Sequence, residues 1–572
     1  MDEALPRVGE FGGGGGRKGR AGARERVGSM STMQKEIFDY VIVGGGSAAS
    51  LLTNRLSADG KTTVCVLEAG PRDKSIFFRI PAGFFKTFRN PNVTWGLKSE
   101  ASWGTNDRQI GLVQGKVLGG SGSINGLVYN RGQADDFNQW AQLGNKGWGY
   151  DDILPYFKKT ERRIGPGDDA YRGRTGGIAV TDIDWKHPLC EAFLEGAASV
   201  GLPRNPDYNG ARQEGVGYLQ RFIENGRRSA AGRVFLHTAM QRGNVDVRCE
   251  AHVTKLLLEG KRAVGVRYQS GRNAPPREIH ARREVIVSAG ATASPKLLQL
   301  SGIGPSGLLG KLGIPVVHDL PGVGENFQDH YAFRVVARIR DGVKTINQLA
   351  RPPLLWWEVA KWALGRPSVL GLQPSLMYGF WKSSPGLENP DIQFISSPGS
   401  YRPGAIYVLD DFPALTCGFF QQRPQSTGYV RAASPDPFEL PVAQPNYLAE
   451  REDQRVAIAG FRMARRLLST PALANLVVAE QLPGKDVNSD DELLDFGRKT
   501  GTTIFHLVGT CKMGPASDPL AVVDPELRVH GVRGLRVIDA SVMPRVVSAN
   551  TYAATLMVAE KGADLVMNGS TA

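Results

Sequence analysis

The sequence predicts an α/β fold of mixed α+β character, in which a Rossmann-like nucleotide-binding domain includes an antiparallel meander. Two observations near the N-terminus predict that domain: an apolar segment runs into three glycines at residues 44–46, and an acidic residue ends the next apolar segment. The third observation is the alternation of polar and apolar residues over 245–287, which is typical of antiparallel strands.

The chain begins with a segment that has the composition of a disordered tail. Residues 1–35 contain the glycine run 12–16, several arginines and no apolar periodicity. They also lack the apolar stretch of a secretory signal. Met30 and Met33 lie just ahead of the first expected strand, so we expect the native chain to start at one of them.

The first element after this tail is a nucleotide-binding fingerprint. Residues 40–43 predict a buried strand, and Gly44 and Gly46 let the backbone of the following turn approach a pyrophosphate at the N-terminus of a helix. A second strand over 63–67 ends at Glu68, where a carboxylate can accept hydrogen bonds from both ribose hydroxyls of an adenosine. The pattern predicts a bound dinucleotide, either NAD or FAD.

Two later stretches belong with this fingerprint. Residues 115–129 are rich in glycine and small hydroxyl side chains, so we expect a loop close to a flat ligand, with Asn125 presenting its amide to it. Residues 285–304 predict a buried strand, a turn of small residues and a helix. Ser294 is the expected N-cap of that helix, and Gly302 marks its C-terminal end.

Both stretches fit, throughout, the two signature patterns of the glucose–methanol–choline (GMC) family of FAD-dependent oxidoreductases. The chain resembles this family from about residue 37 to its C-terminus. The resemblance implies that the dinucleotide is FAD. Some members tether the flavin through a histidine at the position that Ile124 occupies here, so non-covalent FAD is expected.

The resemblance also implies which residues contact FAD. The ADP half is expected beside the glycine turn, the pyrophosphate and isoalloxazine along the first signature, and the adenine beside a meander strand. The residues implied are Gly44, Gly46, Ser47, Ala48, Glu68, Val117, Ser121, Asn125, Gly126, Leu127, Val128, Val253, Asp539, Ala540 and Thr551.

The resemblance further divides the chain into two domains. The FAD-binding domain comprises residues 36–154, 226–329 and 481–572. The remaining segments, 155–225 and 330–480, show no nucleotide-binding pattern and are expected to form a substrate-binding domain in which helices cover a sheet.

Within the second domain, residues 354–364 place three tryptophans on a short and mostly apolar helix. Packing in the core is the default expectation. The alternative is a segment that dips into a lipid monolayer, because tryptophan with basic neighbours such as Lys361 and Arg366 favours the membrane interface. We expect a cytoplasmic protein, to which this alternative adds peripheral contact with the inner membrane face.

The C-terminal part carries the expected catalytic pair. Family members have an H-x-x-G-T signature followed by a second histidine or asparagine, and here the two positions are His506 and Asn550. Oxidising a primary alcohol to an aldehyde requires removal of the hydroxyl proton as hydride leaves for flavin N5. A neutral imidazole suits that proton transfer, so His506 is the predicted general base. Asn550 is predicted to position the substrate oxygen.

A helix over 552–566 is expected directly after this pair, with Asn550 or Thr551 as its N-cap. If its N-terminus points at the N1–C2=O edge of the flavin, its dipole stabilises the negative charge of the reduced ring.

Several functions remain open on the sequence. Electrons are expected to pass to a quinone or another carrier, with an oxidase using O₂ as the alternative. Residues 423–429 and 510–514 look most like the choline-dehydrogenase-type and aliphatic-alcohol-dehydrogenase-type members of the family, and they also resemble fatty-acid photodecarboxylases. The photodecarboxylases replace the histidine and the second polar residue, and they carry a cysteine where this chain has Gln422. The third alternative is a flavin-binding module without alcohol turnover.

The substrate is open as well. Phe84, Phe85, Phe419 and Phe420 either line an entrance for aliphatic or aromatic alcohols or belong to the core. A choline pocket would need an aromatic cage and preferably a carboxylate, and the sequence assigns neither.

Composition excludes several other classes of protein. The 572 residues contain no long uncharged apolar run, so a transmembrane helix is not expected. Five scattered cysteines without a C-x-x-C pair argue for a reducing compartment, and with only eight histidines we expect no metal site. The net charge of +13 comes without a nucleic-acid-binding motif, so we expect a solvated basic face and no nucleic acid partner.

Overall fold

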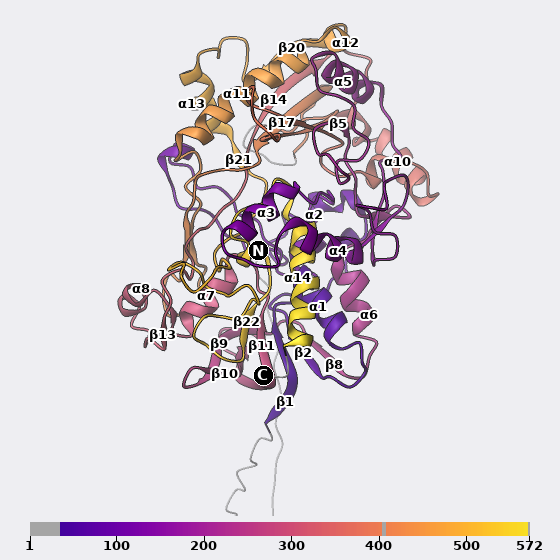
Figure 1. Ribbon diagram of the computed structural model, residues 1–572. Helices are drawn as coiled ribbons and strands as arrows, with labels where there is room; N and C mark the ends of the chain where they lie inside the picture. The colour runs from indigo at the N-terminus through magenta and orange to yellow at the C-terminus, as the bar shows by residue number, and fades with distance from the viewer. Residues whose placement is uncertain (1–34, 403–407, 570–572) are drawn as a thin grey trace, which may run out of the picture. The chain divides into compact units, whose positions relative to one another are not determined.

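The computed structural model describes residues 35–402 and 408–569. The tail expected over 1–35 and the start expected at Met30 or Met33 therefore lie outside the described residues, except for Lys35. From Glu36 onward, the described elements are arranged around two seven-stranded sheets (Figure 1).

The first sheet combines the nucleotide-binding strands with the meander. Parallel pairing joins β8, β2, β1, β11 and β22, and antiparallel pairing adds β10 and β9 beside β11. Its strands are β1 (Glu36–Val43), β2 (Val64–Leu67), β8 (Val245–Arg248), β9 (His252–Glu259), β10 (Arg262–Gln269), β11 (Arg277–Val287) and β22 (Leu535–Val537).

One part of the meander prediction is wrong. Residues 245–248 form β8, which pairs in parallel with β2 at the edge of the sheet, so the antiparallel part begins only at β9. The short strand alternates in sequence as an antiparallel strand would, but all four residues are half-buried because the strand lies at an edge. Alternation alone does not distinguish these two environments.

Two long helices lie side by side next to this sheet: α1 (Ser47–Leu56) and α14 (Thr551–Asn568) (Figure 1). Helix α1 begins directly after the glycine turn that follows β1, and α14 follows β22 after the segment 538–550. Chain segments about 500 residues apart thus bring two helix N-termini into one region, as the salt bridge from Arg55 of α1 to Glu560 of α14 also reflects.

The helix predicted after β11 is present as α7 (Ala293–Leu300), but its cap differs from the prediction. Thr292 occupies the N-cap position, and Ser294 lies inside the first turn, where its hydroxyl donates to Asp539 at 2.6 Å. The competing carboxylate draws the serine side chain away from a capping role. Gly302 follows the helix with φ +83°, as predicted for its end.

The second sheet is antiparallel throughout, in the order β20-β14-β17-β16-β15-β5, with β21 also pairing β14. Its strands are β5 (Gly215–Tyr218), β14 (Tyr331–Ile339), β15 (Met377–Trp381), β16 (Ile392–Ser397), β17 (Ala414–Gln421), β20 (Val477–Leu482) and β21 (Thr502–Thr503). Helices α5 (Pro188–Ser199), α11 (Arg451–Leu468) and α13 (Asp490–Thr500) pack against it in a core that contains Phe333, Phe419 and Phe461. A sheet covered by helices was the predicted form of this domain.

Shorter elements connect and flank the two sheets. The helices are α2 (Phe84–Thr87), α3 (Ala134–Gln142), α4 (Tyr150–Thr160), α6 (His237–Ala239), α8 (Ser306–Lys311), α9 (Ile346–Leu349), α10 (Leu354–Ala363) and α12 (Pro471–Ala474). The strands are β3 (Glu161–Arg163), β4 (Ile178–Val180), β6 (Ile223–Glu224), β7 (Arg227–Arg228), β12 (Ile303–Gly304), β13 (His318–Asp319), β18 (Tyr429–Arg431) and β19 (Val442–Gln444).

Helix α10 carries the three tryptophans, and two of them do not pack in the core. Trp356 and Trp357 are 67% and 62% exposed, whereas the indole N–H of Trp362 donates to the carbonyl of Gly226 at 3.1 Å. The default expectation of core packing is therefore wrong for Trp356 and Trp357. Across the described part of the chain, no helix combines the length and the apolar character needed to cross a bilayer.

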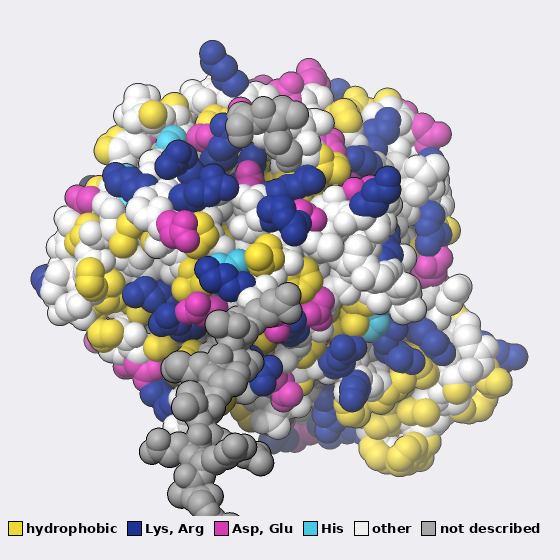
Figure 2. Space-filling model, turned by 90° about the horizontal axis from the view of Figure 1, so that it is seen from below, with side chains coloured by type: hydrophobic (Ala, Val, Ile, Leu, Met, Phe, Trp, Pro, Cys, Tyr) yellow, Lys and Arg dark blue, Asp and Glu magenta, His cyan; other side chains and the backbone are white. Residues whose placement is uncertain are grey.

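The positive charge of the chain is spread over the surface. Figure 2 shows lysine and arginine side chains distributed over one face, with acidic side chains among them. Many lysines and arginines of the described residues are paired, as Arg267 is with Glu278 and Arg248 with Asp246. The face is thus a mixed, solvated surface with a positive excess.

Candidate active site

A cavity of about 870 Å³ is lined by residues from both sheets. The first sheet contributes the glycine turn after β1 and the start of α1, and the second contributes residues of β14, β16 and β17. The predicted residues that line it are Gly44, Gly46, Ser47, Ala48, Glu68, Ser121, Asn125, Gly126, Leu127, Val128, Val253, His506, Asp539, Ala540, Asn550 and Thr551.

Val117 is the predicted contact residue that does not line this cavity. Its side chain is fully buried in a small apolar cluster with Phe78, Val93 and Ile124. The N–H of the preceding Lys116 donates to the carbonyl of Val93, which holds this segment against the cluster. An apolar side chain gains more free energy in such a cluster than at a polar ligand.

Glycines shape the end of the cavity that lies beside α1. Gly44 has φ +94°, and a Cβ added there would lie 2.6 Å from the carbonyl oxygen of Ser288. A Cβ on Gly120 would lie 2.7 Å from the Cα of Gly46. The two glycine-rich loops therefore touch through their backbones, which leaves room for a ligand beside them.

Two helix N-termini open into this cavity. Gly46 is the N-cap residue of α1 and Asn550 that of α14, and neither helix has a side-chain cap or an acidic residue in its first turn. The N–H groups and positive dipole ends are therefore available to anionic or electron-rich ligand groups. A cavity of this size with such a lining fits FAD, whose pyrophosphate carries negative charge.

Glu68 is held by backbone N–H groups of its own domain. Its two carboxylate oxygens accept from Gly45 at 2.8 Å and from Gly70 at 2.7 Å. Burial raises the pKa of Glu68 to about 7, and the two N–H groups oppose that shift. Each oxygen keeps a further lone pair, so the carboxylate can still accept from ribose hydroxyls as the sequence predicts.

Asp539 is also satisfied internally. Its carboxylate accepts hydrogen bonds from the backbone N–H and hydroxyl of Ser541, from the N–H of Gly290 and from the hydroxyl of Ser294. It ties the end of the β22 strand to the turn before α7 at the edge of the cavity. Asp539 therefore shapes this edge by holding loops together.

The predicted catalytic pair meets although 44 residues separate its members in sequence. The Nδ2 atom of Asn550 lies 3.1 Å from Nε2 of His506, and both residues line the cavity. The structure places Asn550 at the N-cap of α14 and Thr551 as its first residue. Because the Asn550 side chain makes no capping bond, its amide is free to face the histidine.

A second histidine, which sequence reasoning did not identify, supports His506 from behind. Nε2 of His330 lies 2.9 Å from the carbonyl oxygen of Gln422, and Nδ1 of His330 lies 2.8 Å from Nδ1 of His506. A carbonyl only accepts, so Nε2 of His330 carries a proton and its Nδ1 must accept from His506. The pattern therefore protonates His506 at Nδ1 and leaves a lone pair at its Nε2, on the cavity side.

Electrostatics keep both imidazoles neutral. Burial and the neighbouring His330 hold the pKa of His506 well below its usual 6.5, and burial lowers the pKa of His330 to about 4. The ring of Phe420 lies 6.0 Å from that of His506 and 4.8 Å from that of His330, which makes the surroundings apolar. His506 is thus an uncharged proton acceptor near neutral pH.

The carboxylate of Asp329 fixes the backbone at both histidines. Oδ1 accepts from the N–H groups of His330 and His506, both at 2.8 Å, and Oδ2 accepts from the hydroxyls of Thr503 and Tyr447. Burial raises the pKa of Asp329 to about 6 against the effect of these donors. The sequence signal that could have suggested this arrangement is the Asp329–His330 dipeptide at the start of an apolar strand.

Two amide side chains in the cavity wall have polar atoms without a partner among the described residues. Oδ1 of Asn550 is buried and accepts no hydrogen bond, and both polar atoms of the buried Gln373 are unpaired. Buried polar groups are normally satisfied, so these atoms are available to a ligand that fills the cavity.

The four phenylalanines for which the sequence allowed either an entrance or a core position divide into two groups. Phe84 and Phe85 line the cavity, whereas Phe419 packs in the core of the second sheet. Phe420 packs behind the histidines, as described above. The cavity wall near α2 is therefore aromatic and apolar.

Comparison with known proteins gives consistent results across the chain. Two family models described as GMC oxidoreductase match residues 38–332 and 424–559. An alcohol dehydrogenase (acceptor) of Pseudomonas putida is 37% identical over 531 residues, covering 93% of this chain and 96% of that protein. An oxygen-dependent choline dehydrogenase of Cronobacter sakazakii is 40% identical over 537 residues, with coverages of 92% and 94%.

Solved structures show the same likeness. A pyridoxine 4-oxidase from Mesorbium loti superposes with a TM-score of 0.82 at 30% identity, covering 92% of this chain and 98% of that one. A formate oxidase of Aspergillus oryzae, studied for the modification of its FAD, superposes with a TM-score of 0.86 at 26% identity, with coverages of 93% and 98%.

Proposed function

Because the chain belongs to the GMC oxidoreductase family of FAD-dependent flavoproteins, we propose that it oxidises a primary alcohol to an aldehyde, with His506 as the general base. The observation that carries this proposal is the unprotonated Nε2 of His506, which faces the cavity beside the amide of Asn550. FAD, when bound, supplies the acceptor for the hydride that leaves the alcohol carbon.

Two residues act on the substrate hydroxyl: one removes its proton and the other orients its oxygen. The Nε2 lone pair of His506 faces the Nδ2 amide of Asn550 at 3.1 Å, so the alcohol hydroxyl must enter between them. There its O–H donates to Nε2, which takes the proton, while Nδ2 of Asn550 donates to the alcohol oxygen and fixes its direction. His506 then becomes an imidazolium whose Nδ1–H still has the lone pair of His330 to bond with. The apolar walls disfavour that charge, so His506 releases the proton readily once the aldehyde leaves.

The cofactor-binding assignments remain part of the proposal. The N-terminus of α1, with Gly46, Ser47 and Ala48, would hold the pyrophosphate, and the N-terminus of α14 at Thr551 would face the flavin. Ile124 offers no nucleophilic atom for a covalent tether, which supports non-covalent binding. The proposed division of the chain into FAD-binding and substrate-binding segments is supported by the two sheets, except that α13 and β21 lie within the segment 481–572 and yet belong with the second sheet.

The test is flavin reduction by alcohols without oxygen. In the His506→Ala variant the proton acceptor is gone, so we expect the reduction rate to fall about 10²–10⁴-fold. Absorbance of the flavin band under anaerobic conditions measures this rate, and the flavin content of the purified variant controls for folding. Unchanged kinetics in a variant that retains its flavin would remove His506 from its role.

The electron acceptor is proposed to be a quinone or another carrier, with O₂ as the alternative. The relative from P. putida is named for an acceptor and that from C. sakazakii as oxygen-dependent, so the family includes both types of name. Hydrogen peroxide formed during turnover in air would identify an oxidase.

We also propose that α10 contacts a membrane surface. Trp356, Trp357 and Leu364 are 67%, 62% and 72% exposed, and Arg351 and Arg366 lie at the two ends of the helix. Exposed tryptophan beside arginine is typical of segments that lie in a bilayer interface.

A further inference from the structure

Strand β14 carries an arginine on the side of the sheet that faces the cavity. Phe333 and Val335 point into the core of the second sheet, where Phe333 packs against Phe419 and Phe461. Ala332 and Arg334 alternate with them, so their side chains lie on the opposite face of the strand, and both line the cavity, which Phe333 also touches. Gly418 lies opposite Arg334 on β17.

The side chain of Arg334 has no hydrogen bond or ion pair with any group of the described residues. The acidic residue whose charge acts on it is Asp410, but the two do not come within ion-pair distance, and the Asp410 carboxylate already accepts from Ser400 at 2.5 Å. Burial lowers the pKa of Arg334, while Asp410 and Tyr401 partly oppose this. A guanidinium still stays charged at neutral pH.

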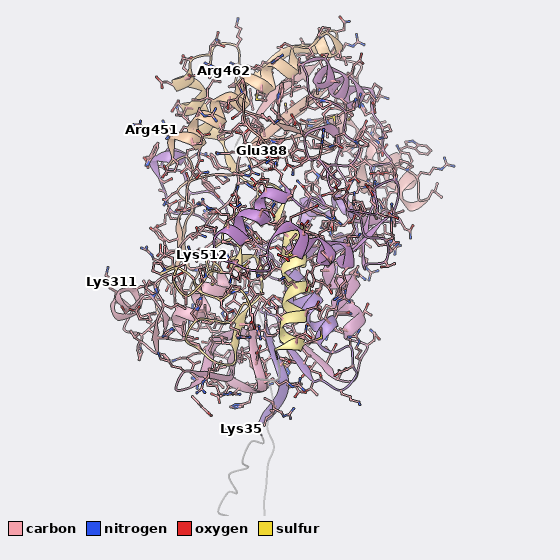
Figure 3. The ribbon with its side chains drawn as sticks, viewed as in Figure 1. Lys35, Lys311, Glu388, Arg451, Arg462 and Lys512 are labelled. Carbon is pink, nitrogen blue, oxygen red and sulfur yellow. The ribbon has the colours of Figure 1, made fainter. Side chains whose placement is uncertain are left out.

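An unpaired cation at this depth differs from the charges on the outer surface. Side chains such as Lys311 and Arg462 project from the molecule and are surrounded by solvent (Figure 3). Arg334 is half-buried and lines the cavity. Placing a charge there without a partner costs free energy, which a ligand of opposite charge would recover.

The charges of the cavity wall are unevenly distributed. Among the described lining residues the acids are Glu68, Asp539 and Glu439, and all three lie toward the first sheet or beside Lys296 of α7. The wall on the side of the second sheet has cations and no acid. Those other than Arg334 already have partners: Arg108 donates to backbone carbonyls, Arg402 pairs with Asp411, and Lys499 pairs with Asp495.

From this arrangement we propose that the substrate is a primary alcohol that carries a carboxylate at its far end, and that Arg334 binds the carboxylate. The proposal rests on the function proposed above and names its substrate class. A planar guanidinium matches a carboxylate with two parallel hydrogen bonds. A trimethylammonium group, as in choline, would meet a cation and no acid on this wall.

The spacing along β14 sets the length of the molecule. His330, which contacts the proposed base, directly precedes β14 and lies four residues from Arg334, so about 13 Å separate their Cα atoms at 3.3 Å per residue. After allowance for the reach of the arginine side chain, the hydroxyl and the carboxylate are separated by roughly six to ten carbons. Val369, Leu372 and Ile395 supply apolar wall for such a chain, and the unpaired amide of Gln373 supplies a further polar contact.

The kinetic test uses three probes of equal chain length: 8-hydroxyoctanoate, its methyl ester and 1-octanol. The measured quantity is the second-order rate constant for anaerobic reduction of the flavin in the holoenzyme. We expect this constant to be about 10- to 100-fold larger for the carboxylate than for the ester. In Arg334→Gln the ratio should fall toward one, and Arg334→Lys should keep part of it because the charge remains. Lys499→Gln removes the same charge from a paired lysine of the cavity and should preserve the ratio.

A binding test needs no turnover. Titrating the oxidised holoenzyme with octanoate should perturb the flavin spectrum at a dissociation constant at least about tenfold lower than with octanamide, and Arg334→Gln should abolish the difference.

These measurements separate the two proposals. Reduction by 1-octanol with no preference for the carboxylate, equal losses in the Arg334 and Lys499 variants, or a preference for choline would each overturn the assignment of Arg334 and leave alcohol oxidation standing. Flavin that no alcohol reduces would overturn the proposed function, while octanoate binding that depends on Arg334 would still support the anion site.

Discussion

At the scale of single residues, the central feature is a chain of hydrogen bonds whose direction is fixed at one end. The carbonyl of Gln422 can only accept, and this sets the tautomer of His330 and, through it, that of His506. The lone pair that a base needs is thereby directed into the cavity. His330 acts through His506 and is a positioning residue, since nothing places it at the substrate.

The lowered pKa of His506 predicts an unusual pH profile. A general base works in its neutral form, so activity is lost as pH falls through the pKa of the folded state. Because burial and His330 hold that pKa well below 6.5, we expect kcat/KM for flavin reduction by a neutral alcohol to stay level down to about pH 6.5 and to fall only below it. Anaerobic stopped-flow measurements across this range would check the profile.

The His330→Asn variant supplies the matched comparison. Without the second imidazole, one of the two causes that lower the pKa of His506 is gone, so the acid limb should move to higher pH and the rate should fall about tenfold. A lower rate with an unmoved acid limb would mean that His330 has only a packing role.

At the scale of elements, strand β14 performs two functions because its side chains alternate. One face supplies Phe333 and Val335 to the core, where Phe333 also borders the cavity, and the other supplies Ala332 and Arg334 to the cavity. His330 directly precedes the strand, so one extended segment connects the histidine pair to the proposed anion site. A shift of register by one residue would exchange the two faces and destroy both.

Helix α10 gives the prediction that belongs to this scale. If Trp356 and Trp357 enter a lipid interface, the protein should co-sediment with vesicles of phosphatidylglycerol, and changing both residues to Ser should reduce the bound fraction several-fold. Added salt should weaken binding by the wild-type protein through its arginines.

The control variant for this prediction is Trp103→Ser. Trp103 is 54% exposed but lies in a different segment, where its ring stacks with Arg498. We expect this change to leave vesicle binding intact. Equal sedimentation of the wild-type protein and the double variant would refute a role of α10 at the membrane.

At the scale of the whole molecule, the cavity lies where both sheets contribute to one wall, and FAD would occupy much of it. A ligand that binds only the folded state stabilises it. Removing FAD should therefore lower the thermal midpoint by roughly 5 °C or more, and adding FAD back should restore it. Differential scanning fluorimetry of the two forms would measure the shift, and identical midpoints would show that the cavity does not hold the cofactor tightly.

Much of the architecture could be predicted because local sequence controls it. The turn at Gly44 needs a backbone that only glycine adopts easily, and the helix after it follows from the residues next in the chain. The predictions of local structure that were wrong concern residues whose conformation depends on groups far away in the sequence. Ser294 looks like an N-cap until Asp539, far along the chain, takes its hydroxyl, and residues 245–248 look like meander until β2 pairs with them in parallel.

The candidate site shows the same division. His506 and Asn550 were recognised from signatures, whereas His330 and Arg334 were missed, since neither stands in a motif and both matter only through what they face. Val117 was placed at the cofactor by its position in a signature, but the direction of its side chain depends on packing with Phe78 and Val93.

The sequence by itself determined the family, the FAD requirement and the two-sheet organisation, and it pointed to His506 as the proposed base, because these depend on short-range patterns of glycine, apolar and polar residues. Only the tertiary structure decided which nitrogen of His506 carries the lone pair and whether the charge of Arg334 is paired. Both depend on neighbours brought together across long stretches of chain, and the hydrogen bonds and electric fields that act on a side chain come from its neighbours in space.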